Sequence, residues 1–280
     1  MSALAQALVY EGYAVSGSDR KYDREPASED RKKLENAGVA IFPQDGSGVG
    51  RGIIAAVVST AIEKDNPDIL AALRLEVEVI HRSEMLDRII RNKRSIAVTG
   101  TSGKSTVTGM TGWALSAMGA DPTVVNGAPV INWSNSRAIG NAREGKSDLW
   151  VVEADESDRS LLRYSPEYVV VTNASEDHFN MDETVDLLEK FARSARSGVV
   201  SALESPGVFR ALDPELHAMG CDFEWRGQKF HIRLPGLHNV WNAVLAASIC
   251  SMLGFDLRPI SEALASFRGI KRRLEYIGQA

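Results

Sequence analysis

The sequence predicts an α/β protein of two domains, each built on a mostly parallel sheet that helices cover. Its 280 residues suffice for two domains of ordinary size. Short apolar runs rich in β-branched residues alternate with segments of helical periodicity, a pattern typical of parallel sheets. Hydrophobic residues make up 44% of the chain and charged residues 25%, which is enough apolar material for a sizeable core.

The first domain is expected over residues 1–92 and opens on a helix. Leu4, Ala7, Leu8 and Glu11 fall at helical spacing, and Gly12 follows as a stop. Strands are predicted over 13–17, 39–42, 53–59 and 77–80, with a further helix over 28–37. A doubly wound domain normally begins with a central strand whose glycine turn binds phosphate. We therefore expect a Rossmann-like domain that lacks its first strand, as a truncated N-terminus would explain.

The second domain is expected over residues 93–280, beyond a charged stretch at 88–94. A strand at 95–98 leads into a glycine turn and a helix that runs through Met118. Further strands are predicted over 149–153, 168–172, 198–203, 222–225 and 229–234, and further helices over 184–195, 237–253 and 259–266. Strands alternating with helices again predict a mostly parallel sheet.

Charge, cysteine content and hydropathy exclude several classes of protein. The formal net charge is −5 and the basic residues form no stripe, so we expect no nucleic-acid partner. No apolar run approaches the length of a membrane-spanning helix, and the start has no basic region before an apolar stretch. Cys221 and Cys250 lack a CxxC neighbour, so we expect buried thiols in a reducing compartment, the cytoplasm.

The strongest local motif is IAVTGTSGKST at residues 96–106. Phosphate binds where glycines allow the backbone N–H groups at a helix start to converge, and a lysine adds a point charge. The strict GxxxxGK[ST] pattern fails, because Val98 stands where the first glycine would be. The placement between a strand and a helix nevertheless predicts a P-loop-type ATPase domain. Its phosphate-binding residues would be Gly100, Thr101, Ser102, Gly103, Lys104, Ser105 and Thr106.

An acidic cluster follows the strand predicted at 149–153. The segment EADESD places four acids within residues 153–158. These acids could simply cap the next helix. Beside a phosphate loop, however, a nucleotide-bound Mg²⁺ requires a carboxylate at a neighbouring strand end. Glu153, the first acid after the strand, is the candidate.

Two further polar clusters follow predicted elements. His178 lies past the strand predicted at 168–172; a lone histidine is more often structural, but imidazole could ligate a second Mg²⁺ or Mn²⁺. Asn239 and Asn242 share one face at a predicted helix start. Their amides could bind an adenine edge, although capping of the helix by Asn239 is the alternative.

Together these motifs resemble the Mur ligase family, and the resemblance covers nearly the whole chain. GTSGKST, EADESD, the TNxxxDH stretch at 172–178 and GLHNVWNA occur in the order and spacing of that family. Shorter matches are SGSD at 16–19, STAI at 59–62, DNP at 65–67, RSEML at 82–86, NG at 126–127, FRG at 267–269 and RRLE at 272–275. No single motif decides the family, but their ordered conjunction is highly specific.

The resemblance implies an ATP-dependent ligase of peptidoglycan precursor synthesis, and hence of cell-wall biogenesis, cell shape and cell division. In the branch that the motifs resemble most, L-alanine is joined to the carboxylate of UDP-N-acetylmuramate through an acyl phosphate. The implied catalytic residues are Lys104, on the phosphates, Glu153, which with Ser105 holds Mg²⁺, and His178, on a second metal. His238, Asn239, Asn242 and Arg273 would contact the nucleotide. Ser18, Asp19, Ser59, Asn66 and Arg82 would lie on the nucleotide-sugar side.

Three departures from the family pattern leave alternatives open. The first strand with its glycine turn is missing, Ser102 replaces the usual His or Asn, and the C-terminal domain that closes over ATP is absent. One alternative is a sister ligase that recycles whole tripeptides onto the same nucleotide sugar. Another is a non-catalytic nucleotide-binding core that a separate chain completes. A third is a P-loop ATPase that does mechanical or transport work.

Overall fold

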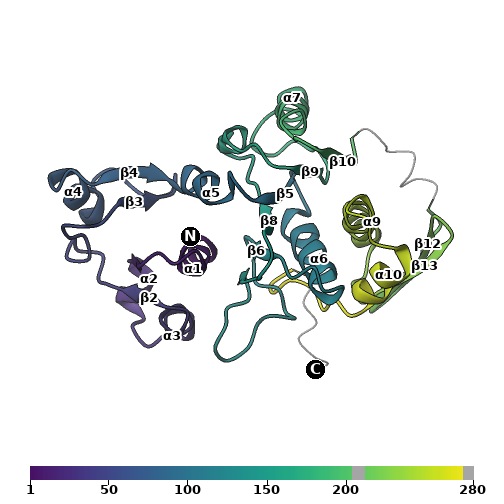
Figure 1. Ribbon diagram of the computed structural model, residues 1–280, viewed down its shortest axis with the longest axis horizontal. Coiled ribbons are helices and arrows are strands. Elements are labelled where there is room, and N and C mark those ends of the chain that lie inside the picture. The colour runs from purple at the N-terminus through teal and green to yellow at the C-terminus, as the bar shows by residue number, and fades with distance from the viewer. Residues whose placement is uncertain (204–211, 274–280) are drawn as a thin grey trace.

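Figure 1 shows a computed structural model of the chain, which describes residues 1–203 and 212–273. The central feature is a six-stranded sheet with the strand order β10-β9-β5-β8-β6-β7. These strands are Gly198–Ser201, Tyr168–Val171, Arg94–Thr99, Leu149–Glu153, Thr123–Val125 and Ala142–Arg143. All neighbours run parallel except β6 and β7, so the prediction of a mostly parallel sheet is confirmed.

Helices cover both faces of this sheet, because its central strands are apolar on both sides. On β5, Ile96 and Val98 pack into one core and Ala97 into the other. The first core is completed by α6 (Lys104–Ala117), α9 (Leu237–Met252) and α10 (Leu257–Ala265). The second is completed by α7 (Met181–Ala192) and by α1 (Ser2–Tyr10) and α5 (Arg82–Ile90). The last two belong to residues 1–92, here called the first unit, and residues 93–273 are called the second unit.

The first unit holds two separate pairs of parallel strands. β1 (Val15–Gly17) pairs with β2 (Val39–Ile41), and β3 (Ala55–Val58) pairs with β4 (Glu78–His81). Among the described residues no strand joins the two pairs. In a doubly wound sheet the first strand lies between the second and the fourth, so the two pairs fit that order without its central strand.

The helix α1 links the two units. Figure 1 places it between the strands of the first unit and β6. Ala7 of α1 is fully buried in the second core of the central sheet. The Gln6 side chain donates a 3.0 Å hydrogen bond to the Asn141 side chain. The division into domains 1–92 and 93–280 stays a prediction, since the second core takes residues from both sides of it.

Several elements differ from those expected. The helix α7 begins at Met181 rather than at residue 184, because the Asn180 side chain accepts from the Glu183 N–H and caps it there. The structure adds α2 (Arg20–Arg24), α4 (Pro67–Arg74) and a short 3-10 turn, Ser160–Arg163, whereas α3 (Glu29–Asn36) confirms the helix predicted over 28–37. The strands predicted over 222–225 and 229–234 are confirmed as β12 (Gly220–Trp225) and β13 (Gln228–Ile232). Together with an additional strand, β11 (Glu215–His217), they form an antiparallel ribbon that packs beside α10.

Candidate functional site

The predicted phosphate loop connects the central strand β5 to α6. Gly100 and Gly103 adopt φ values of +125° and +85°, which disfavour any residue with a side chain. A Cβ at Gly103 would lie 2.6 Å from Asn242 Oδ1, and one at Gly100 would lie 2.2 Å from Thr172 Oγ1. Both positions therefore require glycine, because a side chain there would clash with Asn242 or Thr172. The N-terminus of α6, which favours anions, opens at this loop.

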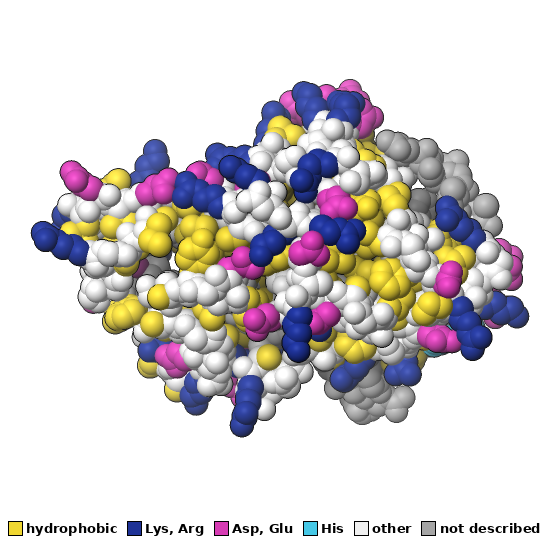
Figure 2. All heavy atoms as spheres, in the orientation of Figure 1, with side chains coloured by type: hydrophobic (Ala, Val, Ile, Leu, Met, Phe, Trp, Pro, Cys, Tyr) yellow, Lys and Arg dark blue, Asp and Glu magenta, His cyan; other side chains and the backbone are white. Residues whose placement is uncertain are grey.

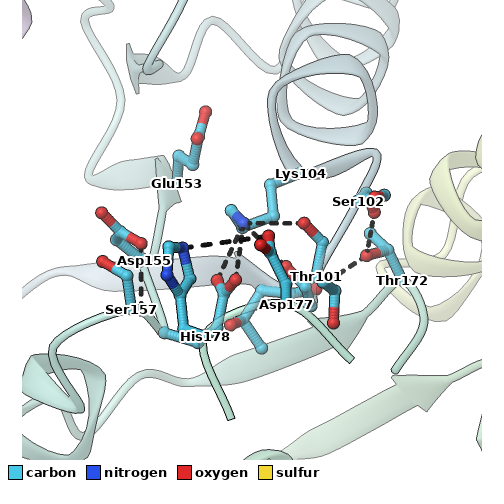
Figure 3. Close-up of polar contacts among 12 residues, drawn as sticks. Thr101, Ser102, Lys104, Glu153, Asp155, Ser157, Thr172, Asp177 and His178 are labelled. Carbon is cyan, nitrogen blue, oxygen red and sulfur yellow. Dashed lines mark hydrogen bonds and ion pairs between the residues drawn. The ribbon is translucent and has the colours of Figure 1, made fainter. Parts of the chain in front are cut away.

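The end of β9 holds the loop in shape. Asn173 Oδ1 accepts a 3.0 Å hydrogen bond from the Ser102 N–H, and the Thr172 hydroxyl donates to the Ser102 carbonyl at 2.6 Å. The Thr101 N–H donates to the Asn173 carbonyl at 3.2 Å. Figure 3 shows Thr172 and Ser102 facing each other at the strand end. The TNxxxDH motif thus positions the loop through its first two residues, a role that sequence reasoning did not assign.

The Lys104 side chain lies across the loop rather than out in solvent. Its Nζ donates to the carbonyls of Gly100 and Thr101 at 2.8 and 3.2 Å. Lys104 Nζ also lies 2.8 Å from a carboxylate oxygen of Glu156, a residue that is only 3% exposed. Burial raises the pKa of the Glu156 carboxyl, and the ion pair with Lys104 opposes that rise. Sequence reasoning missed Glu156, because it chose the first acid after the strand.

The NG motif at residues 126–127 contacts both predicted magnesium ligands, Glu153 and Ser105. The Gly127 N–H donates to Glu153 Oε2 at 2.8 Å, and the neighbouring Asn126 side chain donates to the Ser105 carbonyl at 3.0 Å. The Ser105 hydroxyl is buried and has no hydrogen-bond partner among the described residues. A buried hydroxyl without a hydrogen-bond partner fits a ligand of Mg²⁺, which prefers oxygen ligands.

The expected second metal ligand, His178, stands in a more open position. It is exposed on the loop that follows β9, and its Nε2 lies 3.8 Å from Asp177 Oδ2. Figure 3 shows this pair near Lys104. In the described part of the chain no three His, Cys, Asp or Glu side chains are grouped to hold a metal. The role of His178 stays a prediction.

The other two acids of EADESD, Asp155 and Asp158, contact residues of the first unit. Asp155 Oδ2 accepts a 2.5 Å hydrogen bond from Arg82, and Asp158 Oδ2 lies 3.4 Å from His81 Nε2. Burial opposes ionisation of Asp155, but hydrogen bonds from Ser157 and Arg82 outweigh it and lower the pKa of its carboxyl. Burial also lowers the pKa of the His81 imidazole. Arg82, expected on the nucleotide-sugar side, is thus paired with the acidic loop.

The start of α9 touches the phosphate loop. Asn242 lies against Gly103, as its contact with a Cβ built there shows, and its amide donates to Asn239 Oδ1 at 3.3 Å. Asn239 in turn donates to the Pro235 carbonyl at 2.8 Å, which is a local structural role. His238 is exposed nearby. Arg273, the last described residue, donates its backbone N–H to the Ile270 carbonyl at 3.2 Å.

Three of the five nucleotide-sugar candidates make local bonds in the first unit. The Ser18 hydroxyl donates to the Asp68 carboxylate. Asp19 and Asn66 cap α2 and α4 by accepting from backbone N–H groups at 2.8 and 2.9 Å. Ser59 is exposed. These bonds fit structural roles, and binding by these residues stays a prediction.

The fold and this site define a P-loop-type nucleotide-binding protein. A model described as "Mur ligase family, catalytic domain" matches residues 1–94, and one described as "Mur ligase middle domain" matches residues 98–193. Together the two models match most of the chain. The chain belongs to the Mur ligase family.

Named relatives agree with this assignment. UDP-N-acetylmuramate–L-alanine ligases of Cyanothece sp. and Burkholderia ambifaria are 34% and 35% identical, over 100% of this chain in both cases. The chain spans only 63% and 65% of those two relatives. In no described helix is there an apolar stretch long enough to cross a bilayer.

Solved structures show the same fold. The UDP-N-acetylmuramate–alanine ligase of Thermotoga maritima matches with a TM-score of 0.84 at 26% identity, over 100% of this chain and 69% of that one. A Neisseria meningitides ligase that acts on a whole tripeptide matches with a TM-score of 0.78 over 97% of this chain and 96% of that one. At 22% identity the second match shows the fold alone.

Proposed function

We propose that this chain is the ATP-binding core of a ligase that joins L-alanine to UDP-N-acetylmuramate. The observation that carries the proposal is the phosphate loop between β5 and α6, which supplies Lys104 and Ser105, with Glu153 at the end of the neighbouring strand β8. The names of relatives at 34% and 35% identity over the whole chain support the substrates. The tripeptide-recycling alternative is not favoured, because it rests on fold similarity alone.

The chain's own residues would act mainly on charge and position. Backbone N–H groups of the loop and the Lys104 ammonium would bind the phosphates and stabilise the charge that spreads over the transferred group. The lactyl carboxylate would attack the γ-phosphorus, and the bond to the bridging oxygen of ADP would break. The L-alanine amine would then displace phosphate from the acyl phosphate and leave an amide.

The donor set fits a magnesium ion. Ser105 Oγ and Glu153 would hold it, and Gly127 would orient the carboxylate. When bound, Mg²⁺ would neutralise the repulsion between the triphosphate and the attacking carboxylate. His178 remains our candidate for a second Mg²⁺ or Mn²⁺, since its loop lies at the same sheet edge.

The partners we propose are UDP-N-acetylmuramate and an amino acid, with the cytoplasm as the location. The curated relatives carry the matched region within one longer chain. The expectation that a separate chain supplies a C-terminal domain therefore finds no support.

Product formation measured by mass spectrometry tests the proposal. The purified chain is mixed with Mg-ATP, UDP-N-acetylmuramate and either L-alanine or the recycled tripeptide. We expect an L-alanine amide that Lys104→Ala does not form. An amide formed only from the tripeptide would establish the alternative. Absence of any product, together with absence of Mg-ATP binding by calorimetry, would refute the proposed function.

A further inference from the structure

The Lys104 ammonium has no N–H group left for a phosphate in this structure. A lysine ammonium carries three N–H donors. Here they meet three acceptors, the carbonyls of Gly100 and Thr101 and the carboxylate of Glu156. A phosphate that binds Lys104 must therefore displace at least one of these acceptors or share its hydrogen.

Glu156 is the acceptor whose displacement matters most for the free energy. It carries the only charge among the three, and its side chain is only 4% exposed. A buried carboxylate that loses its cation is strongly unfavourable, because the interior solvates it poorly. The two carbonyls, in contrast, belong to the loop backbone and stay beside the lysine whatever it binds. Phosphate binding at Lys104 thus opposes the ion pair with Glu156.

The two residues before Glu156 are both held in place, so the backbone at Glu156 stays near the phosphate loop. The Ala154 N–H donates to the Val98 carbonyl at 2.8 Å, and Ala154 is fully buried. Asp155 is tied to Arg82 at 2.5 Å. The backbone therefore keeps the Glu156 side chain within reach of Lys104, where it competes with any phosphate that approaches the lysine.

We propose that Glu156 is a positioning residue that competes with nucleotide phosphates for Lys104. It holds the ammonium across the phosphate loop, and the β- and γ-phosphates displace it when the nucleotide binds. The inference rests on the proposed binding of ATP at this loop. It assigns Glu156 a role different from that of Glu153, whose carboxylate accepts from the Gly127 N–H.

Binding of nucleotides with different numbers of phosphates tests this competition. Glu156→Gln keeps the shape and an acceptor oxygen but removes the charge. We expect it to bind a non-hydrolysable ATP analogue about tenfold more tightly than wild type, with and without Mg²⁺. Affinity for AMP, which lacks the β- and γ-phosphates, should not change. Glu156→Asp, which keeps the charge on a shorter side chain, should lie between wild type and Glu156→Gln.

Glu167→Gln is the matched control, because Glu167 is a partly buried carboxylate that pairs with Arg94 at 3.2 Å. It should leave ATP-analogue and AMP binding unchanged. Unchanged or weaker ATP-analogue binding by Glu156→Gln would overturn the inference, as would an equal change for AMP. Weaker binding in Mg²⁺ alone would show that Glu156 is a metal ligand instead. Failure of the wild-type chain to bind any nucleotide would contradict the proposed function, and this inference with it.

Discussion

The two units of the chain share one alternation of strands and helices but bury their strands to different extents. In β5 every residue except Arg94 is buried, whereas β1 and β3 contain no buried residue. Hydrophobic side chains also reach the surface of the molecule (Figure 2), and on the first unit Ile54 and Leu73 are 74% and 60% exposed. A parallel strand is fully buried only with a neighbour on each side and a helix on each face.

This difference explains where the site residues can be held accurately. The phosphate loop leaves β5, which has β8 and β9 as neighbours, and hydrogen bonds from the end of β9 fix it. The two-stranded pairs of the first unit have less to hold them, since an isolated pair of strands is at best marginally stable. They depend instead on helices such as α1, which pack against the central sheet.

The largest effect should come from truncating a large buried side chain on the central sheet. Trp150 on β8 is 1% exposed. Its replacement by Ala should lower the free energy of unfolding by about 3–5 kcal/mol, the usual cost of a large-to-small change in a core. Val57→Ala on the half-buried β3 should cost less, about 0.5–1.5 kcal/mol. Urea unfolding of both variants measures the difference, and equal losses would show that the two units are packed alike.

The second prediction concerns the ion pair between Lys104 and Glu156. Lys104→Ala leaves a buried carboxyl without its cation, so it should lower the free energy of unfolding by about 1–3 kcal/mol at neutral pH. The double variant Lys104→Ala/Glu156→Gln should regain much of that stability without regaining nucleotide binding. Urea unfolding and calorimetry with an ATP analogue distinguish the two effects.

The pH dependence follows from the direction of the Glu156 shift. Its pKa is raised in the folded chain, so the folded state binds more protons than the unfolded state above the ordinary glutamate pKa of 4.5. This group's contribution is therefore most favourable below that pKa and falls as the pH rises through the folded value. The fall should be steeper in Lys104→Ala and absent in the double variant. An identical pH profile in all three proteins would contradict the burial of this carboxyl.

A smaller effect should follow from a methyl group added at Gly127. A Cβ there would lie 2.7 Å from Glu153 Oε1, so Gly127→Ala should displace the carboxylate. We expect Mg²⁺-dependent ATP-analogue binding to weaken about tenfold, as is usual when a partner of a metal ligand is lost. Gly50→Ala in the first unit is the control, because nothing lies within 4 Å of its Cβ. Unchanged dependence on Mg²⁺ in Gly127→Ala would argue against Glu153 as a ligand.

The sequence predicted those parts of the fold that local pattern determines. The strand β8 has the predicted bounds, and the phosphate loop lies between the predicted strand and helix. Strands of two or three residues, such as β6 and β7, are too short to show a period. The docking of α1 on the central sheet was not predicted either, because the contact between Gln6 and Asn141 joins residues far apart in the chain.

For the site, too, the sequence predicted the motif but not which residue of it makes each contact. The motif EADESD predicted a carboxylate beside the phosphate loop, with Glu153 as the candidate, and the structure places Glu156 on Lys104. Which acid reaches Lys104 depends on the path of the loop after β8, which the bond from the Ala154 N–H to the Val98 carbonyl directs. That path leaves Glu153 on Gly127 and brings Glu156 to the lysine. Residue type and spacing do not contain this information.

The smallest effect should come from the ion pair that joins the two units. Asp155 and Arg82 are each about one third exposed, at 33% and 35%. Asp155→Asn should therefore lower the free energy of unfolding by only about 0.2–1 kcal/mol, as is usual for exposed pairs. It should also tighten binding of an ATP analogue, but less than Glu156→Gln does, because the segment that holds Glu156 beside Lys104 becomes looser. Calorimetry and urea unfolding measure both quantities.

The control for Asp155→Asn is a second ion pair between the same units. Glu84 of α5 lies 3.4 Å from Arg163, which is separated from Glu156 along the chain, whereas Asp155 is the immediate neighbour of Glu156. Glu84→Gln should cost a similar amount of stability and leave nucleotide binding unchanged. If both variants tightened the binding, general loosening between the units would be the cause. If neither did, the segment 153–158 would hold Glu156 through its bond to β5 alone, and the first unit would not affect the phosphate loop.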